Sequence, residues 1–262
     1  MHATVIAGDG TGWAQKISSD ATEILPLEVA RRAQQIAEEA RRPQAILPEP
    51  TTLIMSPAAT AELLMFLFWA GFDGKAADEG RTFLRGCLGK KIFDDKFTLR
   101  SRPDEPRCPG RPFHNDGLAA PNVAWVEKGV VTHYSDSRFW AQKTGRPPTG
   151  RPTNLILESG NVSLEQMIAA TERGLLATRF WYVRFVDPMA PTVTGMTRDG
   201  LFVVEKGRVV SAARHLRFNV NLRDVFNHIE AVGMAERAGA NIPMLAPALM
   251  VSDFRFTSAT RF

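Results

Sequence analysis

The chain has 262 residues, of which 44% are hydrophobic and 23% are charged, and its formal net charge is +4. This composition is typical of a globular protein with a sizeable core, and its arginines are too scattered to form the basic, aromatic-rich patch that would favour nucleic-acid binding. Two cysteines, Cys87 and Cys108, exclude a disulfide framework, and residues 1–13 contain no signal sequence, so a cytoplasmic location is expected.

The first quarter of the chain predicts one strand, two helices and a short second strand. Residues 2–12 alternate weakly and end in GDGTG, which predicts a strand followed by a turn. Over residues 26–42 apolar side chains recur every three or four positions between two prolines, which predicts an amphipathic helix. A short strand is expected over residues 52–55, and a second helix is expected over residues 57–68.

The most apolar stretch of the chain is ELLMFLFWAGFDGK, at residues 62–75. The ten residues between Glu62 and Asp73 carry no charge. A membrane-spanning helix needs about 20 apolar residues, so this run is too short to cross a bilayer. Apolar side chains occur on every face of the predicted helix, which indicates a buried core helix and no membrane association.

From about residue 95 the sequence predicts short strands that are rich in β-branched and aromatic residues. VEKGVV at 126–131 and VEKGRVV at 204–210 predict two hairpins of the same shape, each with a Lys-Gly turn. Helices are expected over residues 163–174 and 222–233, each ending at a glycine. The predicted fold class is α+β, with an N-terminal helical portion followed by a mostly antiparallel, β-rich C-terminal domain.

The sequence contains no common catalytic or metal-binding motif. None of the five histidines lies three or four residues from another, so the helical spacing that brings two zinc ligands together is missing. There is also no Gly-x-Ser-x-Gly sequence for a serine nucleophile. His114, Asp116 and His133 could meet across strands, and they are kept as an alternative metal site.

Several segments resemble a known family. GLLATRFWYVRFVDP at 174–188, TGMTRDGLFVVEKGRVVSAARHLRFN at 194–219 and IEAVG at 229–233 are together similar to the C-terminal domain of the TldD/PmbA family, once called modulator of DNA gyrase. The segments RGCLGKKI and NDGLAAPNVAWVEKGVV and the late sequence DFRFTS follow the family order. On this resemblance residues 1–50 are a remnant of the family's N-terminal domain, a strand plus a helix, and residues 51–262 are the C-terminal domain.

The resemblance implies two kinds of subunit. The TldD kind carries His-Glu-x-x-x-His on the helix of the apolar stretch, and a late cysteine completes its zinc site, where the glutamate would polarise a zinc-bound water. The PmbA (TldE) kind lacks these ligands and pairs with the first. Aligning RTFLRGCLG places the two histidines near Met65 and Ala70, in a window that holds only apolar side chains, and no cysteine follows Cys108. The chain therefore resembles the PmbA kind, with no catalytic residue, metal ligand or cofactor of its own.

The leading hypothesis is a non-catalytic, PmbA-like partner of a TldD-like zinc peptidase, in a heterodimer or larger complex that processes unfolded peptides. The Gly/Pro-rich segment 142–154 supplies three candidate peptide-binding residues, Arg146, Arg151 and Asn154. One alternative is a peptidase in its own right that uses the atypical metal residues named above. The other is a stand-alone peptide-binding or scaffold module.

The most family-like string also contains three charged residues, Arg179, Arg184 and Asp187. A buried ion pair that serves packing is expected among them, because buried charges are stable only when they are paired.

Overall fold

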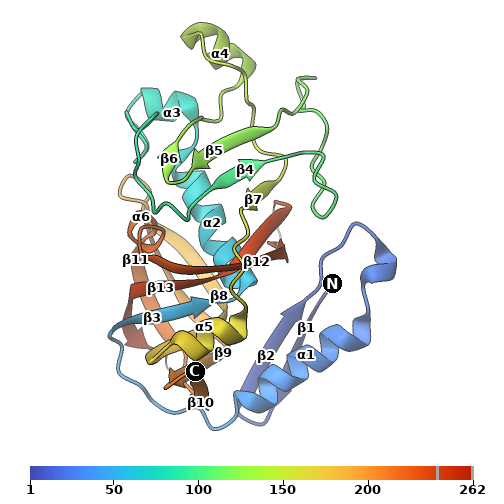
Figure 1. Ribbon diagram of the computed structural model, residues 1–262, viewed down its shortest axis with the longest axis vertical. Coiled ribbons are helices and arrows are strands. Elements are labelled where there is room, and N and C mark those ends of the chain that lie inside the picture. The colour runs from blue at the N-terminus through green and yellow to red at the C-terminus, as the bar shows by residue number, and fades with distance from the viewer. Residues whose placement is uncertain (240–241, 261–262) are drawn as a thin grey trace.

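A computed structural model describes residues 1–239 and 242–260. The chain begins with a hairpin and a helix that pack together (Figure 1): β1 is His2–Ala7, β2 is Gly10–Gln15, and α1 is Pro26–Glu39 after the short 3-10 helix η1, Ala21–Glu23. A Cβ atom on Gly12 would lie 2.1 Å from the carbonyl oxygen of Ala33, so this glycine lets β2 approach α1 closely. The prediction of a helical N-terminal portion is not confirmed, because the glycine-rich turn reverses the chain into a second strand.

Eleven strands form one large sheet within the described residues. Its path is β10-β9-β8-β3-β13-β7-β4-β5-β6, with β11 and β12 joined to β13. The strands are β3 Pro50–Met55, β4 Leu99–Ser101, β5 Val123–Glu127, β6 Val130–Val131, β7 Leu155–Leu157, β8 Arg173–Asp187, β9 Thr192–Glu205, β10 Arg208–Ala212, β11 Leu216–Asn221, β12 Ile229–Ala238 and β13 Met244–Ala259. Both predicted hairpins, β5–β6 and β9–β10, are confirmed, and each turns at a Lys-Gly pair with positive φ.

Part of this sheet closes on itself. β9 pairs with β8, β8 with β3, β3 with β13, β13 with β11, and β11 with β9, which makes a ring of five strands. Phe180 of β8 contacts Phe218 of β11 across the ring, with 4.8 Å between ring centroids. The pairs β3–β8 and β7–β13 are parallel, so the predicted mostly antiparallel domain is in fact built on a mixed sheet. These pairings join segments far apart in the sequence, and no local pattern reports them.

Helix α2, Pro57–Gly71, runs from the strands around β8, β12 and β13 toward the strands around β5 (Figure 1). Ser56 caps it by accepting a hydrogen bond from the amide of Ala59 at 3.3 Å, and Pro57 occupies its first turn. The helix packs against β8, β12 and β13, and Phe68 meets Trp125 of β5 at 5.3 Å between centroids. Because most of its side chains are buried, the prediction of a core helix is confirmed.

The remaining helices are short: α3 is Gly74–Asp78, α4 is Arg138–Thr144, α5 is Leu164–Ala170 and α6 is Leu222–Val225. The helices predicted over 163–174 and 222–233 are therefore too long, and residues 229–233 belong to β12 instead. Pairing of β12 with β13 overrides the helical spacing of the apolar residues in this segment. No helix among the described residues has both the length and the hydropathy that crossing a bilayer requires.

Candidate functional site

Helix α2 offers apolar side chains at the two places where the family resemblance puts zinc-binding histidines. Met65 is 5% exposed and Ala70 is 6% exposed, and the only carboxylate of the helix is Glu62. Zinc needs three or four nitrogen, thiolate or carboxylate ligands. The side chains of Met65 and Ala70 supply none of these, and Glu62 alone is too few. Within residues 1–239 and 242–260 no three His, Cys, Asp or Glu side chains are grouped so that they could hold a metal.

The alternative metal residues are brought together only in part. His114 and Asp116 both line a hollow of about 370 Å³ beyond the C-terminal end of α2. The ring of His133 lies elsewhere, and its Nδ1 atom is 2.7 Å from the carbonyl oxygen of Ala124. These three residues therefore do not form one group of ligands in the structure.

Two of the three predicted peptide-binding residues are engaged in the fold. Arg146 forms ion pairs with Asp78 at 2.6 Å and with Asp136 at 2.7 Å. Asn154 is fully buried, and its side-chain amide donates to two backbone carbonyl groups at 2.6 and 2.7 Å. Only Arg151 is exposed, and it lines the same hollow beyond α2.

The expected buried ion pair is present, but its acid comes from a different strand. Arg179 Nε lies 3.5 Å from Asp199 Oδ2, and the two side chains are 13% and 4% exposed. Arg184 and Asp187 are exposed near the end of β8. Of the three residues considered, only Arg179 is in a buried ion pair, and its acid lies outside that segment because the pairing of β8 with β9 brings in Asp199.

An aromatic groove of about 590 Å³ lies between the N-terminal hairpin and β8, and its lining includes Trp13, Glu62, Arg179, Trp181 and Tyr182. The guanidinium of Arg179 is 4.6 Å from the ring centroid of Trp13 and 4.7 Å from that of Trp181. Burial raises the pKa of Glu62, and the charge of Arg179 opposes this rise. A carboxyl group with a raised pKa in a groove is a candidate binding or proton-transfer group. Sequence reasoning missed it because β2, α2 and β8 meet only in the folded chain.

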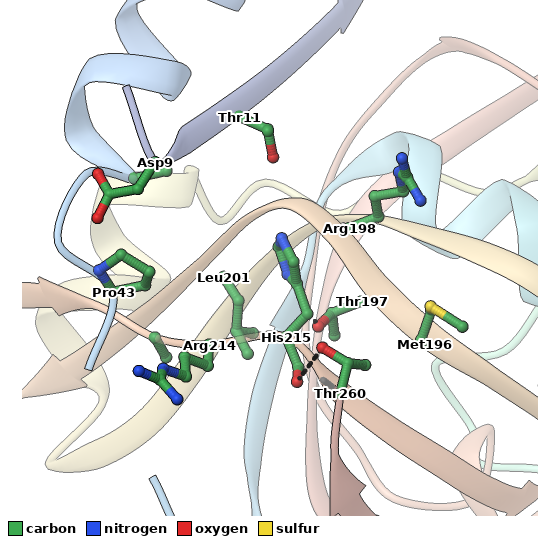
Figure 2. Close-up of a pocket in the computed structure, with 12 residues that line it drawn as sticks. Asp9, Thr11, Pro43, Met196, Thr197, Arg198, Leu201, Arg214, His215 and Thr260 are labelled. Atoms are coloured by element: carbon green, nitrogen blue, oxygen red, sulfur yellow. Dashed lines mark hydrogen bonds between the residues drawn. The ribbon is translucent and has the colours of Figure 1, made fainter. Parts of the chain in front are cut away.

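A second cavity, of about 470 Å³, lies between the turn of the hairpin, strand β9 and residues 213–215, which precede β11 (Figure 2). Asp9 accepts hydrogen bonds from a backbone amide at 3.1 and 3.2 Å, and Arg198 lies 3.9 Å from Asp199. Figure 2 shows the side chains of Arg198 and Arg214 pointing in different directions, with His215 between them. The cavity therefore has no converging set of catalytic groups, although it contains a titratable histidine.

The burial of His215 is expected to make the free energy of unfolding depend on pH. Burial lowers the pKa of His215 below its ordinary value of 6.5, and the charge of Asp199 opposes this shift only in part. As the pH falls below about 6.5, the unfolded chain gains a proton at this residue before the folded protein does, so the free energy of unfolding decreases. His215→Gln is expected to flatten this decrease below about pH 6.5 in urea unfolding curves. Equal slopes for the wild type and His215→Gln would contradict the prediction.

Comparison with known proteins places the chain in a family. Residues 48–258 match the family model described as PmbA/TldA metallopeptidase C-terminal domain. The Metalloprotease PmbA of Escherichia coli O157:H7 is 26% identical over 167 residues, which cover 62% of this chain and 36% of the relative. A metalloprotease of Methanothermobacter thermautotrophicus is 22% identical over 263 residues, which cover 91% of this chain and 57% of the relative. The chain thus spans less than two thirds of the length of these relatives.

Solved structures share the fold at low sequence identity. A protein of Thermotoga maritima that is named as a modulator of a DNA gyrase superposes with a TM-score of 0.87 at 20% identity, over 98% of this chain and 61% of that one. TldE of Thermococcus kodakarensis superposes with a TM-score of 0.86 at 20% identity, over 97% of this chain and 61% of that one. At such identity the likeness establishes the fold alone.

Proposed function

Because this chain belongs to the TldD/PmbA metallopeptidase family, we propose that it is the non-catalytic, PmbA-like subunit of a cytoplasmic complex that processes unfolded peptides. Its partner is a TldD-like subunit that binds the catalytic zinc. The observation that carries this proposal is the chemistry of α2, where buried Met65 and Ala70 stand near the places of the family's histidines. A thioether and a methyl group cannot supply the ligands that the zinc site of a peptidase requires.

Two features support a role in holding peptide. The rings of Trp13, Trp181 and Tyr182 give the aromatic groove apolar faces that contact side chains of many kinds. Strand β10 ends the path of the large sheet, and its Val209 and Val210 are 44% and 46% exposed. An extended peptide that adds to a sheet edge is held through its backbone, so such binding depends little on the peptide sequence.

The proposal is tested by mixing the purified chain with a TldD-like subunit. We expect the two to elute together in size-exclusion chromatography, and the mixture to cleave unstructured peptides faster than the TldD-like subunit alone. Cleavage should stop when a zinc chelator is added. Cleavage by this chain alone at the rate of the mixture would contradict the proposal, and so would a stable homodimer of this chain that does not associate with the TldD-like subunit.

A further inference from the structure

The hollow beyond α2 is rich in positive charge. Four segments of the chain form it: the start of α3, the loop around His114, the approach to α4, and residues 150–151. The charged residues of its lining are Lys75, Arg111, Arg138 and Arg151, against Asp73 and Asp116. The hollow has a volume of about 370 Å³, which is within the range of small-ligand sites.

Its three arginines are not neutralised by acids of the same chain. In the part of the chain that the structure describes, none of them forms an ion pair. Arg111 donates one hydrogen bond to the side-chain oxygen of Asn115 at 3.1 Å, and Arg138 donates one to the backbone carbonyl of Asp116 at 3.1 Å. A guanidinium group has five N–H donors, so most N–H donors of these three arginines remain available to a ligand.

The two acids of the lining are occupied by backbone amides. Asp73 caps α3 by accepting a hydrogen bond from the amide of Ala76 at 2.8 Å. Asp116 accepts one from the amide of Leu118 at 3.2 Å. Each carboxylate holds a turn of the backbone and keeps its charge. The lining is still net positive, because it has four cationic side chains and two acidic ones.

The floor of the hollow is shaped by a glycine. A Cβ atom on Gly150 would lie 2.4 Å from Nε2 of His114, so the imidazole ring packs directly on the backbone there. This Nε2 atom is buried and has no hydrogen-bond partner among the described residues. The buried Trp140 adds an apolar wall, so the hollow combines the guanidinium groups of three arginines with one aromatic surface.

We propose that this hollow binds a carboxylate group of the peptide, either its C-terminal carboxylate or an Asp or Glu side chain; the inference rests on the proposed function. Arginine forks match a carboxylate in shape and bind it with two parallel hydrogen bonds. The hollow begins at Asp73, just after α2 ends at Gly71. A carboxylate bound there is held at the end of α2, the helix that corresponds, by the family resemblance, to the one that carries the catalytic motif in TldD-like subunits.

The test measures binding by the full chain of a fluorescein-labelled, unstructured peptide of Gly, Ser and Glu with a free C-terminus. The variant is Arg111→Gln/Arg151→Gln, and the control is Arg31→Gln/Arg223→Gln, which removes the same charge from exposed sites on α1 and α6. We expect the variant to bind about tenfold more weakly or worse, and the control to bind like the wild type. Amidating the C-terminus and replacing Glu by Gln in the peptide show which carboxylate is bound, since the matching change removes the difference between variant and wild type.

Equal binding by wild type, variant and control, or affinity that neither peptide change reduces, would overturn the inference. The same peptides are then cleaved in the mixture with the TldD-like subunit. If the chain stimulates cleavage of a peptide that is both amidated and Gln-substituted as strongly as that of the unchanged peptide, the proposed function stands and the hollow beyond α2 is not its recognition site. If the wild-type chain binds none of these peptides, both the inference and the peptide-holding role fall.

Discussion

Replacing Arg146 by Met is expected to lower the free energy of unfolding by about 3 kcal/mol or more. Asp136 is 2% exposed, and Arg146 donates to its two carboxylate oxygens at 2.7 and 2.9 Å. The same guanidinium donates to Asp78 at 3.0 and 2.6 Å. Without the arginine the buried carboxylate of Asp136 has no cationic partner. Leaving one buried charge unpaired destabilises a protein by more than the intact ion pair stabilises it.

Urea unfolding of Arg146→Met, with Arg151→Met as the exposed control, measures this loss. Adding Asp136→Asn to Arg146→Met should recover part of it, because the buried charge is then gone.

The hydrogen bond from Arg146 is the largest cause that lowers the pKa of Asp78. A carboxyl group with a lowered pKa contributes stability above its unfolded pKa, near 3.8, and loses it as the pH falls through the lower folded value. The difference between wild type and variant should therefore shrink in strong acid, and a variant as stable as the control would refute this account.

Placing histidines in α2 is expected to destabilise the protein without creating a zinc site. Met65→His/Ala70→His puts two imidazole groups at positions that are 5% and 6% exposed. Burying polar groups without partners and overfilling a packed core together cost about 3–5 kcal/mol. Two histidines do not complete the three or four ligands of a zinc site, so added zinc should not restore the loss.

The matched control is Trp69→His on the same helix. Trp69 is 49% exposed, and its ring meets Phe66 at 5.6 Å, so its loss should cost only about 1 kcal/mol. Thermal unfolding of both variants with and without zinc gives the comparison. A double variant that zinc stabilises strongly would show that further ligands lie within reach of α2, contrary to this description of the helix.

Local patterns predicted much of the fold, and long-range pairing decided the rest. The apolar run of α2 and the Lys-Gly turns at Lys128 and Lys206 depend on neighbouring residues, and the structure confirms them. The segment IEAVG lies in β12 because β13 pairs with it, a partner that helical spacing cannot reveal. The same limit applies to the parallel pairs that make the sheet mixed, since each joins segments that are distant in the sequence.

The site residues divide in the same way. Arg146 lies in a Gly/Pro-rich segment typical of a solvated loop, yet its partner Asp78 is 68 positions away along the chain. A buried ion pair was expected among Arg179, Arg184 and Asp187, but only Arg179 forms one, with an acid from the neighbouring strand. Composition and spacing identify which residues carry charge, but the fold determines which of these charges are neutralised. That distinction separates Arg146, which is held by two acids, from Arg151, which is available in the hollow.

The most direct test of the central claim is the zinc content of the purified full chain after equilibration with excess zinc and removal of free metal. A non-catalytic subunit with an apolar α2 should retain far less than stoichiometric zinc, and the recovered protein should cleave no unstructured peptide. Stoichiometric zinc together with cleavage that a chelator abolishes would contradict the account, because this chain would then bind the catalytic metal itself.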